Sequence, residues 1–191
     1  QAQQRFAEYD FMRYELLNID ADVRLQGFAA GSYDVGIATN VLHATPCMRN
    51  TMRNCRALLR PGGLMVVNEV VRTNAFAQIT FGLTDGWWFF ASDPGRRNEI
   101  SPLMAWETWV RLFAEAGFER SYRMNGPGPL EAQAVMIGSV ARRDGGAAPP
   151  AAGGHVLANA DSPLGVIAGK ALVQGGATRL VLATPGAVSK A

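Results

Sequence analysis

The feature that most constrains the fold is a pair of mostly apolar runs, Tyr33 to Thr39 and Leu64 to Val71, separated by about one helix's length of chain. Such runs are typical of strands covered on both faces of a parallel sheet. Between them, Pro46 opens a segment with apolar residues at spacings of three and four, and Pro61-Gly62-Gly63 closes it. This pattern predicts a helix whose left-handed cap is Gly62 or Gly63. A right-handed βαβ unit follows, which places the chain in the α/β class.

The elements on either side of this unit are less regular. We expect a strand over Phe11–Ile19, and a lid-like helical excursion over the aromatic stretch Ala75–Phe90, followed by a polar loop from Ser92 to Asn98. Ser101 as N-cap and Pro102 as first helical residue predict a helix that ends at Gly117. Beyond it, the segments 118–123 and 134–140 predict an antiparallel hairpin at the edge of the sheet.

Two polar residues follow the strands of the central unit. His43 comes just after the first strand and Glu69 stands near the end of the second. Ligands of open α/β sheets bind at this edge, so we expect any chemistry there. By spacing alone, such a histidine is more often structural or at the surface. The glutamate could equally be a solvated loop carboxylate or a helix-cap acceptor.

Composition excludes several classes of protein. The formal net charge of +2 is spread without a basic run, so nucleic acid is not an expected partner. No apolar run is long enough to cross a membrane, no signal peptide opens the chain, and we expect no metal site. Cys47 and Cys55 fall on one predicted helix, too far apart for a disulfide, which favours a reducing, cytoplasmic location. The chain begins at Gln1 in a helical pattern, and we expect it to be part of a longer polypeptide.

Several motifs together resemble the second half of a class I methyltransferase, and more narrowly the C-methyltransferase domain of polyketide synthases. The motifs that carry the resemblance are Phe28–Val35, Asn40–Thr45, Leu58–Gly63, Glu69, Phe81–Leu83, Gly86–Trp88 and Trp106–Phe118. The resemblance covers most of residues 1–140 and implies a Rossmann-like sheet with a terminal antiparallel hairpin. It also implies S-adenosylmethionine as cofactor.

The resemblance assigns roles to individual residues. The family's catalytic histidine and glutamate fall on His43 and Glu69. C-methylation of a β-ketoacyl thioester needs a base for the carbon between two carbonyls, which suits a histidine oriented by a carboxylate. The resemblance places Asn18 and Asn40 at the cofactor. Phe81, Trp87 and Trp88 could line the acyl pocket, although aromatic residues at this spacing are as often part of a core.

The sequence also departs from the family. The glycine-rich loop that holds the cofactor in the family should precede Gln1, so half of the cofactor site is expected outside this chain. The family often has an aspartate near the adenine ring; Asn18 stands at that place, with Asp20 nearby.

The composition changes at residues 143–154, where glycine, alanine and proline predict a linker between a domain over 1–142 and a segment over 155–191. The later segment resembles the first strand, helix and second strand of a polyketide ketoreductase. Of the fingerprint glycines only Gly165 remains, and Pro163 stands in the phosphate loop. We expect a structural pseudo-ketoreductase segment that binds no NADP.

These observations favour part of a multidomain polyketide synthase that methylates the α-carbon of a β-ketoacyl chain. The implied partners are an acyl carrier protein with a phosphopantetheine-linked substrate and the neighbouring synthase domains. Two alternatives stay open: an inactive pseudo-methyltransferase scaffold, and a free-standing small-molecule methyltransferase.

Overall fold

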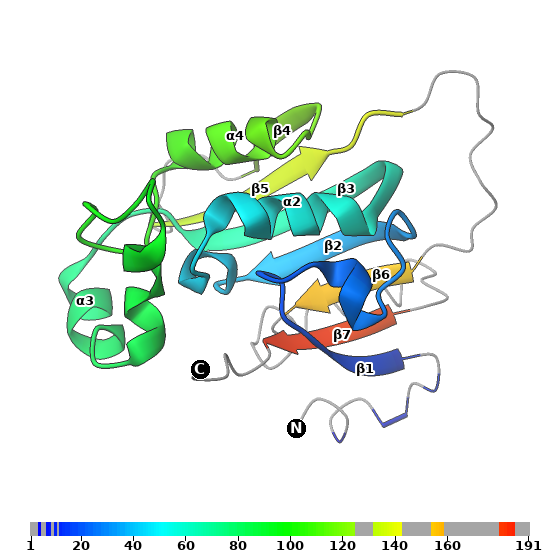
Figure 1. Ribbon diagram of the computed structural model, residues 1–191, viewed down its shortest axis with the longest axis horizontal. Coiled ribbons are helices and arrows are strands. Elements are labelled where there is room, and N and C mark those ends of the chain that lie inside the picture. The colour runs from blue at the N-terminus through cyan, green and yellow to red at the C-terminus, as the bar shows by residue number, and fades with distance from the viewer. Residues whose placement is uncertain are drawn as a thin grey trace.

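The computed structural model describes residues 12–124, 132–142, 154–158 and 180–185, together with isolated positions before residue 12. Its centre is one seven-stranded sheet in the order β1-β7-β6-β2-β3-β5-β4 (Figure 1). The strands are β1 (Met12–Leu17), β2 (Tyr33–Thr39), β3 (Leu59–Val70), β4 (Arg120–Arg123), β5 (Gln133–Ser139), β6 (Gly154–Ala158) and β7 (Leu180–Pro185). The expectation of an α/β fold is confirmed.

The central pair of strands forms as its composition predicts. β2 and β3 pair in parallel from Val35 with Leu64 to Thr39 with Asn68. Ala38 and Val67 are fully buried on this pair. Helix α2 (Met48–Leu58) joins the two strands, and its buried face includes Met48, Met52 and Cys55. The apolar runs therefore mark the middle of the sheet.

The Pro-Gly-Gly turn has a different role from the predicted one. Helix α2 ends at Leu58, and its C-cap residue Leu59 is extended and pairs with Tyr33, so the chain enters β3 directly. Gly62, at φ +76°, stands inside β3 and is not the helix cap. A side chain at Gly63 would lie 2.9 Å from the Arg60 carbonyl and 3.1 Å from that of Asp34. The two glycines thus shape an irregularity in the strand, where only glycine fits.

The antiparallel edge agrees with the prediction, whereas the start of the last helix does not. β5 pairs antiparallel with β3 and with β4. Helix α4 (Trp106–Glu115) has Ala105 at its N-cap, so the predicted start at Ser101 and Pro102 is wrong. The Ser101 hydroxyl accepts a hydrogen bond from the Leu103 N–H, a local turn that competes with helix formation. The helix ends before Gly117, at φ +86°, as predicted.

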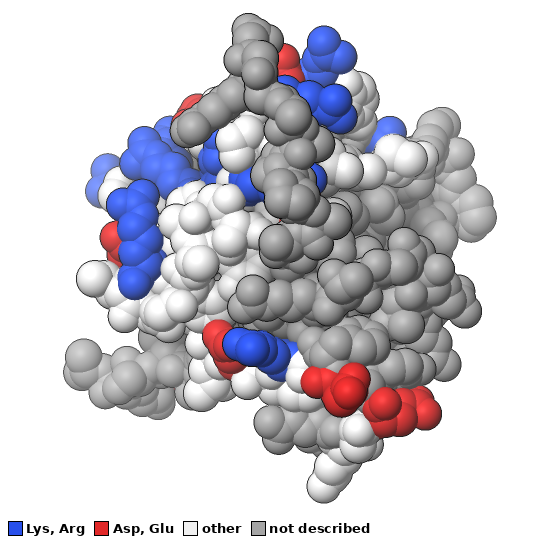
Figure 2. All heavy atoms as spheres, turned by 90° about the vertical axis from the view of Figure 1, so that its right-hand side faces the viewer, with Lys and Arg blue, Asp and Glu red and all other residues white. Residues whose placement is uncertain are grey.

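Helices cover the sheet and close its carboxyl edge. Figure 1 shows α2 and α4 on the same face of the sheet. The core between them includes Met52, Trp109 and Phe113. Helix α3 (Ala75–Phe81) and the 3-10 helix η3 (Asp85–Ser92) form the predicted excursion and lie beyond the arrowhead of β2 (Figure 1). On the face drawn in Figure 2, basic side chains gather mainly in the upper part and acidic ones mainly below.

Strands β6 and β7 come from the segment that the sequence predicts to be a separate unit. β6 pairs in parallel with β2, β7 pairs in parallel with β6, and β1 pairs in parallel with β7. β6 and β2 are neighbours in the sheet. The strand that follows β6 in the chain, β7, lies on one side of this pair, and the strand that follows β2, β3, lies on the other side. Adjacent strands that wind away in opposite directions form a topological switch point, where open α/β sheets bind ligands. The helix expected between β6 and β7 lies outside the described residues.

Candidate active site

The loop after β2 is held by a carboxylate from the neighbouring strand. Asn40 adopts a left-handed conformation at φ +48°, and the short helix η2 (Leu42–Ala44) follows. The N–H groups of Val41 and Leu42 donate to Glu69 Oε1 at 3.0 and 2.9 Å. Glu69 lies in β3 and is fully buried. One of its oxygens therefore fixes the main chain just after the end of β2.

The second oxygen of Glu69 bonds the imidazole of His43. The distance from His43 Nδ1 to Glu69 Oε2 is 2.6 Å, and the histidine side chain is 12% exposed. An ionised carboxylate only accepts hydrogen bonds, so Nδ1 of the neutral imidazole carries the proton and donates it. Nε2 is then the basic nitrogen. The structure thus brings together the two predicted catalytic residues as an oriented pair.

The surroundings of His43 change its pKa in opposing directions. Burial lowers the pKa, the charge of Glu69 and its hydrogen bond raise it, and Arg96 lowers it. The net effect is a pKa above the ordinary value near 6.5. The carboxylate therefore stabilises the imidazolium, which is the form the ring takes after it accepts a proton.

Aromatic side chains of the excursion pack at the imidazole. The Trp87 ring lies edge-on to the His43 ring, with the centroids 6.3 Å apart, and stacks on Phe81 at 5.9 Å. The Trp87 indole N–H donates to Gln78 Oε1 at 3.0 Å, and Trp87 is buried. Phe81 is more than half exposed. Of the three predicted pocket residues, these contacts place Trp87 against the His43 ring and Phe81 against Trp87.

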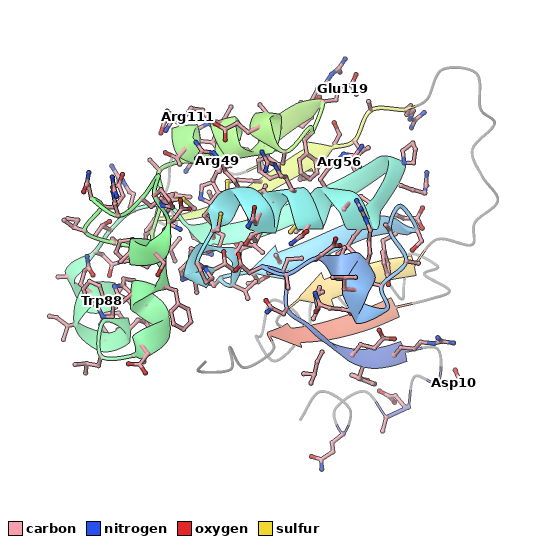
Figure 3. All side chains as sticks on the ribbon, viewed as in Figure 1. Asp10, Arg49, Arg56, Trp88, Arg111 and Glu119 are labelled. Carbon is pink, nitrogen blue, oxygen red and sulfur yellow. The ribbon has the colours of Figure 1, made fainter. Side chains whose placement is uncertain are left out.

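Trp88, the third predicted pocket residue, is placed differently. Its ring lies 6.1 Å from that of Phe90, and its indole N–H donates to the Gly82 carbonyl at 2.9 Å. Half of its surface is exposed, and Figure 3 shows it in the α3–η3 segment beyond the sheet edge. None of its described contacts is with His43 or Glu69.

The two asparagines predicted at the cofactor lie at different strand ends. Asn40 belongs to the same loop as His43, and its Oδ1 accepts from Gln133 Nε2 at 3.0 Å. Asn18 follows β1, which two strands, β7 and β6, separate from β2 in the sheet order, and its Oδ1 accepts from the Asp20 N–H at 3.1 Å. Both residues stand at the carboxyl edge, but only Asn40 is near the His43–Glu69 pair.

Asp93 and Arg96 are buried in the segment that the sequence predicts to be a polar loop. The Asp93 carboxylate accepts from the Met48 N–H at 3.1 Å and from the Gly95 N–H at 2.9 Å, which joins the excursion to the start of α2. The Arg96 guanidinium reaches the His43 carbonyl. Sequence reasoning missed both residues because a Ser-Asp-Pro-Gly stretch is typical of exposed turns. Their burial depends on tertiary contacts that no local pattern records.

The described residues contain no group of three His, Cys, Asp or Glu side chains that could hold a metal ion. None of the helices within the described ranges is long and apolar enough to cross a membrane.

Comparisons with known proteins agree with this geometry. A family described as "Methyltransferase domain" matches residues 1–65. The polyketide synthase ThaQ of Burkholderia thailandensis is 42% identical over 118 residues, which are 61% of this chain and 6% of ThaQ. The chain thus spans a small part of its curated relatives.

Two solved structures share the fold. The crystal structure of the CurJ carbon methyltransferase superposes with a TM-score of 0.67 at 34% identity, covering 73% of this chain and 38% of CurJ. That of the trans-methyltransferase CalH in complex with SAH superposes with a TM-score of 0.66 at 39% identity, covering 73% of this chain and 39% of CalH. Residues 1–65 therefore match a methyltransferase domain, and the chain is similar to carbon methyltransferases and to polyketide synthases.

Proposed function

We propose that this chain is part of a polyketide synthase and transfers a methyl group from S-adenosylmethionine to the α-carbon of a β-ketoacyl thioester on an acyl carrier protein. The observation that carries the proposal is the His43–Glu69 pair, with 2.6 Å between Nδ1 and Oε2, at the carboxyl edge of parallel strands. The identity to ThaQ, CurJ and CalH supports the reaction class. The resemblance to polyketide synthase C-methyltransferases implies the substrate and its carrier, and the pair suits the deprotonation that this substrate needs.

The pair performs the deprotonation in this reaction. Nε2 of His43 accepts the proton from the carbon between the two carbonyls, and the C–H electron pair passes to the enolate. Glu69 holds the proton on Nδ1 and stabilises the imidazolium that forms. S-adenosylmethionine, when bound, supplies the electrophilic methyl group that this carbon takes up. Trp87 packs against the imidazole edge and limits the positions that the ring can adopt.

The described residues fit part of the cofactor. Asn40 stands in a left-handed conformation beside the switch point, where its carboxamide would meet the methionine end of S-adenosylmethionine. Asn18, at the end of β1, would lie on the adenine side. The rest of the cofactor site would come from sequence outside residues 12–142.

The remaining assignments are also proposals. Residues 1–142 would form the methyltransferase part, 143–154 a linker and 155–191 a pseudo-ketoreductase segment that binds no NADP. Neighbouring synthase domains and the carrier protein would be the partners, in the cytoplasm, with neither nucleic acid nor membrane involved. The free-standing methyltransferase is disfavoured by the segment over 155–191, which resembles a degenerate ketoreductase.

Calorimetry and product analysis on the intact synthase test this function. We expect S-adenosylmethionine to bind, and the mass of the β-ketoacyl product to increase by one methyl group. His43→Ala should reduce methyl transfer by roughly 10²- to 10⁴-fold and leave the cofactor affinity nearly unchanged, since His43 acts on the substrate side. His155→Ala is the matched control, as these are the only two histidines in the chain. Absent binding would indicate the pseudo-methyltransferase scaffold, and full turnover of His43→Ala would remove His43 from the mechanism.

A further inference from the structure

Arg96 is a buried cation at the back of the His43 loop. It follows η3 in the chain and is 6% exposed. Its Nη1 lies 3.5 Å from the His43 carbonyl oxygen, and its Nη2 donates to the Pro102 carbonyl. Its Cζ lies 5.4 Å from the centre of the Phe90 ring, which is the geometry of a cation–π contact. One side chain therefore joins the His43 loop, η3 and the segment before α4.

Within the part of the chain that the structure describes, the guanidinium has no direct ion pair. Among the described residues, no carboxylate lies within ion-pairing distance of it, and its buried Nε has no hydrogen-bond partner. Burial lowers the pKa of Arg96, and the more distant charges of Asp93, Glu99 and Glu69 oppose that change. A buried, incompletely bonded cation costs several kcal/mol by order of magnitude. An apolar residue would fill the same place at a lower cost, so a structural role alone does not account for arginine here.

We propose that Arg96 is a positioning residue for His43, holding the main chain of His43 and placing a fixed positive charge beside the His43–Glu69 pair. Its catalytic consequence rests on the proposed function, whereas its effect on the imidazole does not. The Arg96 charge is not used in the deprotonation step itself. It acts through His43.

The charge arrangement predicts the direction of this effect. The charged groups that face the His43 ring are Glu69 from β3 and Arg96 from the segment after η3. Glu69 favours the protonated ring and Arg96 opposes it. Without Arg96, only burial opposes the effect of Glu69, so the pKa of His43 rises further and less free base remains at neutral pH. Arg96 thus keeps more of the histidine ready to accept a proton.

NMR titration of the 191-residue chain tests this without any catalytic assay. With only two histidines, the ring ¹⁵N signals of His43 are assigned by comparison with His155→Gln. We expect Arg96→Met to move the His43 midpoint to higher pH and to leave that of His155 unchanged. Arg96→Lys retains the charge and should stay near the wild-type midpoint. An unchanged or lowered His43 midpoint in Arg96→Met would overturn the proposal.

Matched variants separate the charge from the fold. Arg97→Met removes the neighbouring cation, which is exposed, and should leave the His43 titration unchanged. Should Arg96→Met fail to fold, Arg96→Gln, which keeps hydrogen-bond donors without the charge, takes its place with the same expected rise. An equal shift in Arg97→Met would show a general surface effect and overturn the proposal.

The intact synthase provides the second readout. In Arg96→Met, the acidic limb of the kcat profile should move to higher pH, with a loss of roughly 10- to 100-fold at neutral pH that is partly recovered in alkali. Arg96→Lys should restore the position of the limb. If kcat of Arg96→Met falls by the same factor at every pH, the Arg96 charge does not act on the His43 pKa and the proposal is contradicted. If the NMR shift occurs and even the wild type transfers no methyl, the proposed function fails and the role of Arg96 at His43 stands.

Discussion

At the scale of single residues, the two carboxylate oxygens of Glu69 have different hydrogen-bond partners. Oε1 accepts from the N–H groups of Val41 and Leu42, and Oε2 accepts from His43 Nδ1. The bonds to Oε1 belong to the fold, because they satisfy two main-chain donors at a buried strand end. The bond to Oε2 belongs to the chemistry. Substitutions of this residue can therefore distinguish stability from activity.

Glu69→Ala and Glu69→Gln should differ in stability. Alanine leaves the Val41 and Leu42 donors without their acceptor, which should lower the free energy of unfolding by about 3 kcal/mol. Glutamine keeps an oxygen for them and should cost about 1 kcal/mol. Urea denaturation followed by circular dichroism measures both values. Equal losses for the two variants would mean that the main-chain hydrogen bonds contribute little.

At the scale of elements, the sequence predicts the buried strands, because burial requires apolar residues. It misses the features that depend on tertiary contacts. β2 and β3 are readable because strands covered on both faces must be apolar. His43 and Glu69 follow from their positions at strand ends, together with the surrounding motif.

The misses have a common physical origin. Ser101 and Pro102 are good helix-start residues, but their groups bond to Leu103 and Arg96 instead, so α4 starts later. Gly62 has the expected left-handed conformation, but it lies inside β3 and not at the helix end, because Leu59 already pairs with Tyr33. Asp93 and Arg96 carry no periodic signal, since their burial depends on contacts with α2 and with the His43 loop.

At the scale of the whole molecule, the sheet depends on strands from the far end of the chain. Within the described residues, β7 is the strand partner of β1, and β6 pairs with β2 on the side opposite β3. No local pattern predicts this arrangement, because the pairing joins segments more than 100 residues apart. It also bears on the predicted division at 143–154, which would separate these strands from the sheet.

Deletion of residues 143–191 should therefore expose β1 and one edge of β2. We expect the amides of Met12–Leu17 to exchange with solvent at rates close to those of an unstructured peptide, since they lose their strand partner. Hydrogen exchange read by mass spectrometry measures this. Deletion of residues 186–191 alone, beyond β7, is the control. Unchanged protection of β1 after the longer deletion would show that β6 and β7 do not complete the sheet in solution.

The most direct test of the central claim, that His43 and Glu69 act as one catalytic unit, is a double-mutant cycle on the methyl-transfer rate of the intact synthase. Glu69→Gln keeps the main-chain acceptor but offers an amide N–H to Nδ1, which moves the ring proton to Nε2 and removes the base. Each single variant should lose roughly 10²- to 10⁴-fold in kcat. If the two residues act as one unit, the double variant should be no slower than His43→Ala alone. A double-variant loss equal to the product of the two single losses would show that the residues act independently and contradict the claim.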